Sequence, residues 1–144
     1  EDCNGSDLVE FDEYEPNDDC YSCVDLGTDP NLTIYPTTHT ENDTDFFCFT
    51  ADDGFNVPGF GESIEIELLD QPIGMDNDIH LFKGYENCVS NNAIAASVTV
   101  GGQDESLSWD ETNSDDEGVY ILRVTPYEAS SCYKPYTLFI NGLD

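Results

Sequence analysis

Apolar residues alternate with polar ones along most of this chain, and this period of two constrains its fold more than any other feature. In residues 62–68, Ile64 and Ile66 face one side while Glu65 and Glu67 face the other. Such alternation is typical of a β-strand with one buried face. Apolar residues do not recur at spacings of three and four over the length of a helix, so helix signals are nearly absent.

The same alternation recurs in further short segments, with turn dipeptides such as Gly101-Gly102 between them. These segments are 45–50, 78–83, 94–100, 106–109, 119–124 and 135–140, with a weaker one at 32–35. About eight short strands predict an all-β fold, an antiparallel, jelly-roll-like β-sandwich. The predicted core is Phe47, Phe49, Ile64, Ile66, Leu68, Ile79, Leu81, Tyr120, Leu122, Val124, Tyr136, Leu138 and Ile140.

The chain carries 6 cysteines, an even number that is typical of a disulfide framework. Cys20 and Cys23 have the spacing of a zinc knuckle, but no second pair of this kind follows, and His39 and His80 are far apart in the sequence. We therefore expect disulfides rather than zinc, and a secreted, extracellular protein.

Acidic residues outnumber basic ones by 32 to 3, which gives a formal net charge of -29. This balance excludes nucleic acid and anionic membranes as partners, because both are bound through basic groups. A surface so acidic requires cations nearby. Adaptation to a saline habitat and binding of divalent metal ions both remain open as explanations.

Motifs of catalysis and membrane insertion are absent from the sequence. It has no Gly-x-Ser-x-Gly elbow, no His-Glu-x-x-His helix and no phosphate-binding glycine loop, so we do not expect an enzyme. No apolar stretch reaches the length of a membrane span. The ends at Glu1 and Asp144 resemble cuts, so we expect a monomeric module within a larger chain.

The first thirty residues differ in composition from the rest, being rich in Asp, Asn, Ser and Cys. We expect residues 1–30 to form an acidic, Cys-containing segment packed on a sandwich made by residues 31–144, with one domain overall. Cysteines and aromatic residues such as Phe11 and Tyr14 would be unusual in a disordered tail.

Three short segments concentrate the oxygen donors that calcium prefers, namely 13–18, 41–45 and 76–78. The first offers donors at alternate positions, with Pro16 stiffening the bend. Each of these segments, taken alone, is also explained as a polar loop.

Five segments in order resemble the successive signatures of the bacterial pre-peptidase C-terminal domain, which is related to the collagen-binding modules of clostridial collagenases. They are Glu15-Pro16-Asn17-Asp18, residues 43–49, residues 76–82, residues 118–124 and residues 136–140. The resemblance implies a jelly-roll-like sandwich appended to secreted peptidases and other exported hydrolases.

In that family, calcium joins the N-terminal segment to the loop before an early strand. Carried over by position, the resemblance implies the ligands Glu13, Glu15, Asn17, Asp18, Asp43 and Asp45. Glu41 and Asn42 are equally well placed to serve in the second segment.

The cysteines depart from the pattern of the family. Cys48 alternates with inward-facing neighbours, so we expect it on the outer face, clamping the N-terminal segment through Cys20 or Cys23. Cys88 would then pair with Cys132, and Cys3 with whichever N-terminal cysteine remains.

The function expected from these observations is that of a non-catalytic, calcium-binding accessory module, which attaches a secreted hydrolase or surface protein to an extracellular polysaccharide or matrix protein. Aromatic residues outside the inward pattern would form the binding platform. They are Tyr14, Tyr21, Tyr35, Phe46, Phe82, Tyr85, Trp109, Tyr127 and Tyr133. The alternative is a structural spacer or maturation domain with no ligand except calcium.

Overall fold

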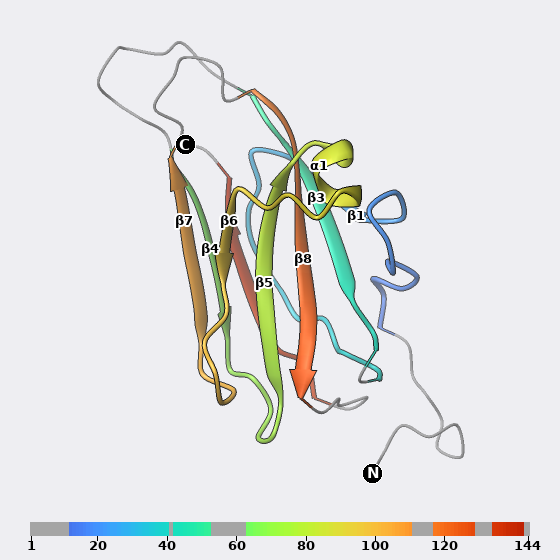
Figure 1. Cartoon of the computed structure of the whole chain (residues 1–144), viewed down its shortest axis with the longest axis vertical. Coiled ribbons are helices and arrows are strands. Elements are labelled where there is room, and N and C mark those ends of the chain that lie inside the picture. The colour runs from blue at the N-terminus through green and yellow to red at the C-terminus, as the bar shows by residue number, and fades with distance from the viewer. Residues whose placement is uncertain (1–11, 41, 53–62, 111–116, 129–133, 143–144) are drawn as a thin grey trace.

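Two β-sheets packed face to face form the fold in the computed structural model (Figure 1). The structure describes residues 12–40, 42–52, 63–110, 117–128 and 134–142. Their elements are β1 (Val24–Thr28), β2 (Asn31–Ile34), β3 (Asp45–Ala51), β4 (Ser63–Leu69), β5 (Asp76–Lys83), α1 (Tyr85–Val89), β6 (Ala95–Ser97), β7 (Glu105–Asp110), β8 (Gly118–Glu128) and β9 (Thr137–Asn141).

One sheet has the strand order β1-β3-β8-β5-β6 and the other β2-β9-β4-β7. The all-β sandwich predicted from the alternation is confirmed. Two elements depart from the prediction. Strand β1 lies where no strand was predicted and runs parallel to β3, while all other pairings among the described residues are antiparallel. The short helix α1 was not predicted.

The core lies between the two sheets and contains every residue that the alternation assigned to it. In β4, Ile64, Ile66 and Leu68 are fully buried while Glu65 and Glu67 are exposed. Ile34, Ala51 and Leu107 complete the buried cluster.

A second, smaller apolar cluster covers the outer face of the five-stranded sheet. Its members are Cys20, Phe46, Cys48, Phe82, Cys88 and Ile121. The N-terminal segment and α1 supply its cover, because Cys20 is bonded to Cys88 and Cys23 to Cys48. Strand β3 is therefore buried on both faces, which the period of two does not reveal.

The disulfides confirm one expectation and correct two. Cys48 does clamp the N-terminal segment on the outer face, through Cys23. Cys88 pairs with Cys20 and not with Cys132. Because Cys20 and Cys23 are both bonded to other cysteines, neither is the partner of Cys3. Cys3 and Cys132 themselves lie outside the described residues.

The expected aromatic platform is also corrected in part. Phe46 and Phe82 are buried in the outer cluster. Tyr21, Tyr35, Tyr85 and Tyr127 are the large aromatic residues that are exposed in the described part of the chain. Tyr14 and Trp109 pack partly buried against the main core, and Tyr133 lies outside the described residues. No described helix has the length and apolar character needed to cross a membrane.

Candidate metal centre

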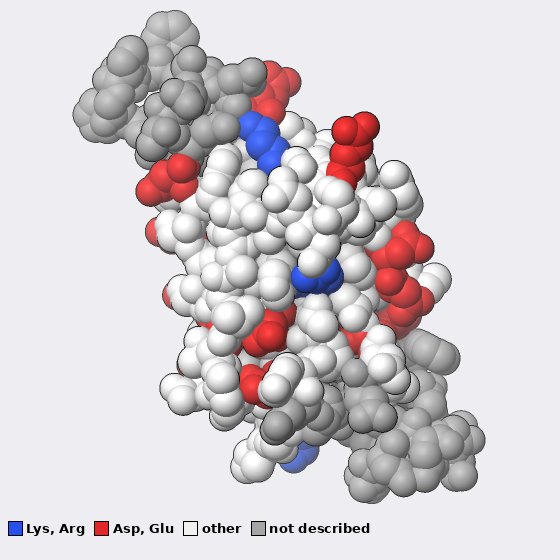
Figure 2. All heavy atoms as spheres, in the orientation of Figure 1, with Lys and Arg blue, Asp and Glu red and all other residues white. Residues whose placement is uncertain are grey.

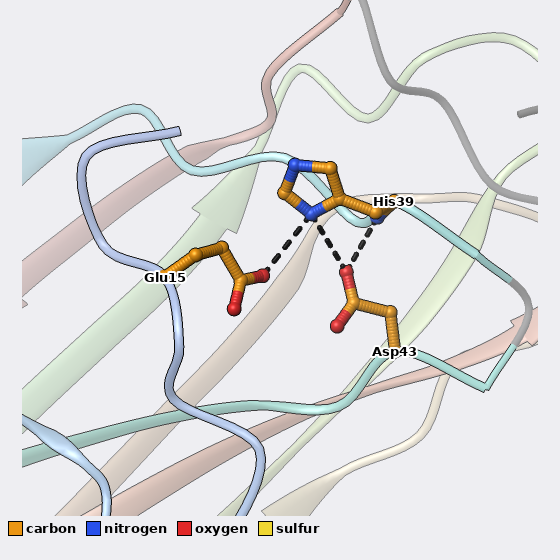
Figure 3. A group of neighbouring side chains, drawn as sticks. All are labelled: Glu15, His39 and Asp43. Carbon is orange, nitrogen blue, oxygen red and sulfur yellow. Dashed lines mark hydrogen bonds and ion pairs between the residues drawn. The ribbon is translucent and has the colours of Figure 1, made fainter. Parts of the chain in front are cut away.

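Two carboxylates and one imidazole converge where the N-terminal segment meets the loop between β2 and β3 (Figure 3). Glu15 comes from the N-terminal segment, and His39 and Asp43 come from the loop. Nδ1 of His39 lies 3.1 Å from Oε1 of Glu15 and 3.0 Å from Oδ2 of Asp43. One ligand atom from each of the three residues lies within 4.8 Å of the others.

Local hydrogen bonds hold the loop in this arrangement. The backbone N–H of His39 donates to Oδ2 of Asp43 at 2.5 Å, and the N–H of Asp43 donates to the carbonyl of Thr40 at 3.1 Å. Oδ2 of Asp12 accepts from the backbone N–H and the hydroxyl of Thr37, at 2.5 and 3.0 Å. Asp12 thereby ties the N-terminal segment to the loop.

Asn17 is fully buried, and neither its amide oxygen nor its amide nitrogen has a hydrogen-bond partner among the described residues. Its backbone N–H donates to Oε2 of Glu15 at 3.3 Å, and its carbonyl accepts from the N–H of Phe46 at 2.9 Å. An unpartnered buried amide costs free energy. The side-chain oxygen of Asn17, two residues after Glu15, is therefore available as a ligand.

Asp45 begins β3 in the same region and is almost fully buried. Burial raises the pKa of Asp45 to about 8, and the Tyr136 hydroxyl, which donates to it at 2.6 Å, opposes the rise. Asp43 and Glu15 raise that pKa further through their negative charges. The pKa of Glu15 is likewise raised, first by burial and then by Asp43. Such mutual repulsion is relieved by a cation.

The cluster opens into a cleft of about 510 Å³, lined by Glu15, Pro16, Asp18, His39, Thr40 and Asp43. The donor set fits a hard cation, because calcium is held by carboxylate and amide oxygens. His39 is the exception, since imidazole is more typical of zinc and other transition metals. Its Nδ1 lies at hydrogen-bond distance from Asp43, so it can orient a carboxylate without touching an ion.

Of the six ligands that the sequence suggested, the structure brings Glu15 and Asp43 together, and the charges of both act on the carboxyl of Asp45. Asn17 contacts Glu15 through its backbone N–H. Asp18 is exposed and lines the cleft. Glu13 is exposed and interacts with Tyr14, whose pKa is raised first by burial and then by the charge of Glu13. Among the alternatives, Asn42 is exposed and Glu41 lies outside the described residues.

Sequence reasoning missed His39 and Asp12 in this cluster. A lone histidine in a threonine-rich loop gives no ligand pattern, so no spacing could have selected it. Asp12 could have been predicted from the sequence, because it directly precedes the donor segment that begins at residue 13.

A second group of carboxylates, Asp76, Asp78 and Glu105, lies where β5 and β7 begin. Asp76 accepts from the backbone N–H groups of Gly101 and Gly102, each at 3.0 Å. Glu105 accepts from the N–H of Thr99 at 2.6 Å and from the hydroxyl of Ser97. Asp76 and Glu105 thus hold the loop between β6 and β7.

Without divalent cations, the free energy of unfolding is expected to fall as the pH rises from about 4 to about 8. Asp45 has a usual pKa of 3.8 and a folded pKa of about 8, so between these values the folded chain retains a proton that the unfolded chain releases. A raised carboxyl pKa contributes stability at low pH that is lost as the pH passes the folded value. Urea unfolding in chelator at pH 5 and pH 8 measures the change.

Asp45→Asn provides the control for this pH dependence. Its amide oxygen can still accept from Tyr136, but the side chain no longer titrates. The variant is expected to lose less stability than the wild type between the two pH values. Equal losses in the two proteins would contradict the assignment to Asp45.

Comparison with known proteins identifies the fold but not the ligand. No model of a protein family matches the sequence, and no curated protein matches it. Among solved structures, the chain is similar to the pre-peptidase C-terminal domain of collagenase from Bacillus anthracis, with a TM-score of 0.57 and 19% identity. The match covers 83% of this chain and 94% of that domain.

The two chains share one fold. The pre-peptidase C-terminal fold that the five sequence segments suggested is thereby confirmed. At 19% identity the likeness concerns the fold alone, so the metal and the polymer partner depend on the residues of this chain.

Proposed function

We propose that this chain is a non-catalytic, calcium-binding accessory module of a secreted hydrolase or surface protein. The observation that carries the proposal is the convergence of Glu15 and Asp43 from two separate segments, together with the buried, unpartnered amide of Asn17 two residues after Glu15. The buried carboxyl of Asp45 adds an oxygen to this set. Calcium takes six to eight oxygens, and water would supply the remainder.

Calcium in this place would join the N-terminal segment to the sandwich. Its charge would offset the burial and the carboxylate repulsion that together raise the pKa values of Glu15 and Asp45. The residues of the cluster would supply binding and orientation only. The ligand set Glu13, Glu15, Asn17, Asp18, Asp43 and Asp45 stays a proposal in which Glu13 has the weakest geometric support.

A cleft lined by carboxylates, in which the pKa of Glu15 is raised by burial, also raises the question of glycosidase-like catalysis. Glycosidases hold their two carboxyl groups about 5 to 10 Å apart so that substrate or water fits between them. Oxygens of Glu15 and Asp43 instead meet at a single ring nitrogen of His39. This crowding around one point favours an ion over a sugar.

Calcium added to chelator-stripped protein is expected to raise its thermal midpoint by about 5 to 10 °C. A ligand that binds only the folded state at a hundred times its dissociation constant adds about 2.7 kcal/mol. In a domain of this size, 1 kcal/mol corresponds to about 2–4 °C. Differential scanning calorimetry in calcium, magnesium or zinc is the measurement. An equal response to magnesium, or a larger one to zinc, would contradict the calcium proposal.

Attachment to a polymer is the second part of the proposed function. The shared fold with a collagenase domain supports it, and so do the exposed tyrosines. Two disulfides among the described residues support a secreted protein, because disulfides persist in oxidising compartments. Co-sedimentation with fibrillar collagen, cellulose and chitin, each with calcium and with chelator, tests the attachment. Retention on none of them would favour the spacer or maturation domain.

A further inference from the structure

Tyr21 and Tyr85 form an exposed aromatic pair that the main core does not use. Their rings stack with centroids 5.6 Å apart and an angle of 8° between the planes. Tyr21 is 73% exposed and Tyr85 is 36% exposed. Rings that leave this much area in water, yet stack on each other, present a flat face to a ligand.

Covalent and hydrogen bonds fix the pair in place. Tyr21 follows Cys20, and Tyr85 begins the helix that carries Cys88, so the disulfide between these cysteines links the two segments. Oδ1 of Asp19 accepts from the backbone N–H of Tyr21 at 2.7 Å. The aromatic pair is therefore preorganised, which lowers the entropy cost of binding.

A small groove lies beside the pair. It has a volume of about 180 Å³. Its described lining includes Tyr21, Asp25, Thr50, Tyr85 and Val119. This volume is below the range of about 300 to 1,000 Å³ that is usual for drug-sized ligands. The groove has room for one long side chain.

Charge decides which side chain fits. Asp25 lines the groove, and none of the described residues of its lining is a lysine or arginine. In Figure 2, red acidic side chains lie along the edge of the molecule where Figure 1 places α1 and the segment before β1. Two of the three basic residues of the chain lie over other rings, Lys83 over Trp109 and Arg123 over Phe82. A cationic group would meet both an aromatic face and a carboxylate here.

We propose that the groove binds an arginine or lysine side chain of an extended protein. The cationic group would lie against the tyrosine pair, with Asp25 as its counter-ion. This inference rests on the proposed polymer attachment and narrows the polymer to a protein that carries basic side chains.

Nuclear magnetic resonance titration of the full chain in calcium tests the proposal. The probe is the blocked peptide acetyl-Gly-Arg-Gly-Arg-Gly-amide, compared with the same peptide containing citrulline, which keeps the shape and lacks the charge. The arginine peptide is expected to shift the ring signals of Tyr21 and Tyr85, and the citrulline peptide is expected to bind at least fivefold more weakly. Equal binding of the two peptides would overturn the proposal.

Tyr21→Ala is expected to weaken binding of the arginine peptide by about fivefold, the scale of one exposed cation–π contact. Asp25→Asn is expected to weaken it by up to about fivefold, the scale of one exposed ion pair. Tyr127→Ala is the matched control. Tyr127 is 70% exposed, near the end of β8 that pairs with the start of β5, whereas Tyr85 follows the end of β5. The control should bind like the wild type, and a loss equal to that of Tyr21→Ala would overturn the site.

Polymer co-sedimentation separates the two proposals. Retention on collagen with no effect of Tyr21→Ala would overturn the groove and leave the attachment function standing. Binding of the arginine peptide at the tyrosines, with no polymer retained, would support the groove and overturn polymer attachment.

Discussion

Alanine at both Cys20 and Cys88 is expected to lower the free energy of unfolding by about 4 kcal/mol, because their disulfide spans 68 residues and constrains the unfolded chain. The same bond covers the outer cluster around Phe46 and Phe82, which would become partly exposed. Whole domains are stable by only about 5–15 kcal/mol. Guanidinium unfolding of the double variant beside the wild type measures the loss.

The second disulfide provides a matched control. Cys23 and Cys48 are 25 residues apart, so replacing both by alanine is expected to cost about 1 kcal/mol less than replacing the first pair. The Cys20 and Cys88 variant should also separate Tyr21 from Tyr85 and weaken binding of the arginine peptide. A loss below about 1 kcal/mol for that variant would contradict the role given to this disulfide.

The double variant Glu15→Gln with Asp43→Asn is expected to abolish the calcium response, a loss of about 2.7 kcal/mol at saturating calcium. In chelator the same variant should be at least as stable as the wild type, because it removes two carboxylates that repel each other. A variant that is less stable than the wild type in calcium, but not in chelator, distinguishes a metal site from an ordinary structural contact. Calorimetry of the variant and the wild type, in calcium and in chelator, measures both differences in stability.

Glu65→Gln with Glu67→Gln is the control for net charge. These residues lie exposed on β4, and their replacement changes the charge by the same amount as the site variant. The control should keep the full calcium response. A calcium response that survives in the site variant, or that the control also loses, would assign the effect to the general acidity of the surface.

The sandwich was predictable because strands such as β4 and β9 are buried on one face only. In β4 and β9, alternation translates directly into burial, and Leu138 and Ile140 lie in the core as expected. The rule fails in β3, where Phe46 faces outward yet is buried. Its cover comes from segments distant in the chain, and alternation within one strand carries no information about a second layer.

Short elements and long-range pairings also escaped prediction. Helix α1 has five residues, which is too few to display a helical period. Strand β1 pairs in parallel with β3, and its partner is fixed by the disulfide between Cys23 and Cys48 as much as by its own pattern. Disulfide partners depend on distances in space that the spacing of cysteines does not encode.

The candidate site was partly predictable because some of its donors follow a local pattern in the sequence. Donors at alternate positions, such as Glu15 and Asn17, leave a local signal, and so do the acids before β3. His39 joins them only because the loop folds back through the contact between its backbone N–H and Asp43. That contact depends on a turn that no pattern in the sequence predicts.

X-ray diffraction from crystals grown in calcium, recorded with the anomalous signal, tests the central claim most directly. The account predicts a peak about 2.3–2.6 Å from carboxylate oxygens of Glu15 and Asp43, with the amide oxygen of Asn17 among its ligands. An anomalous map with no peak between these residues at millimolar calcium would contradict the account.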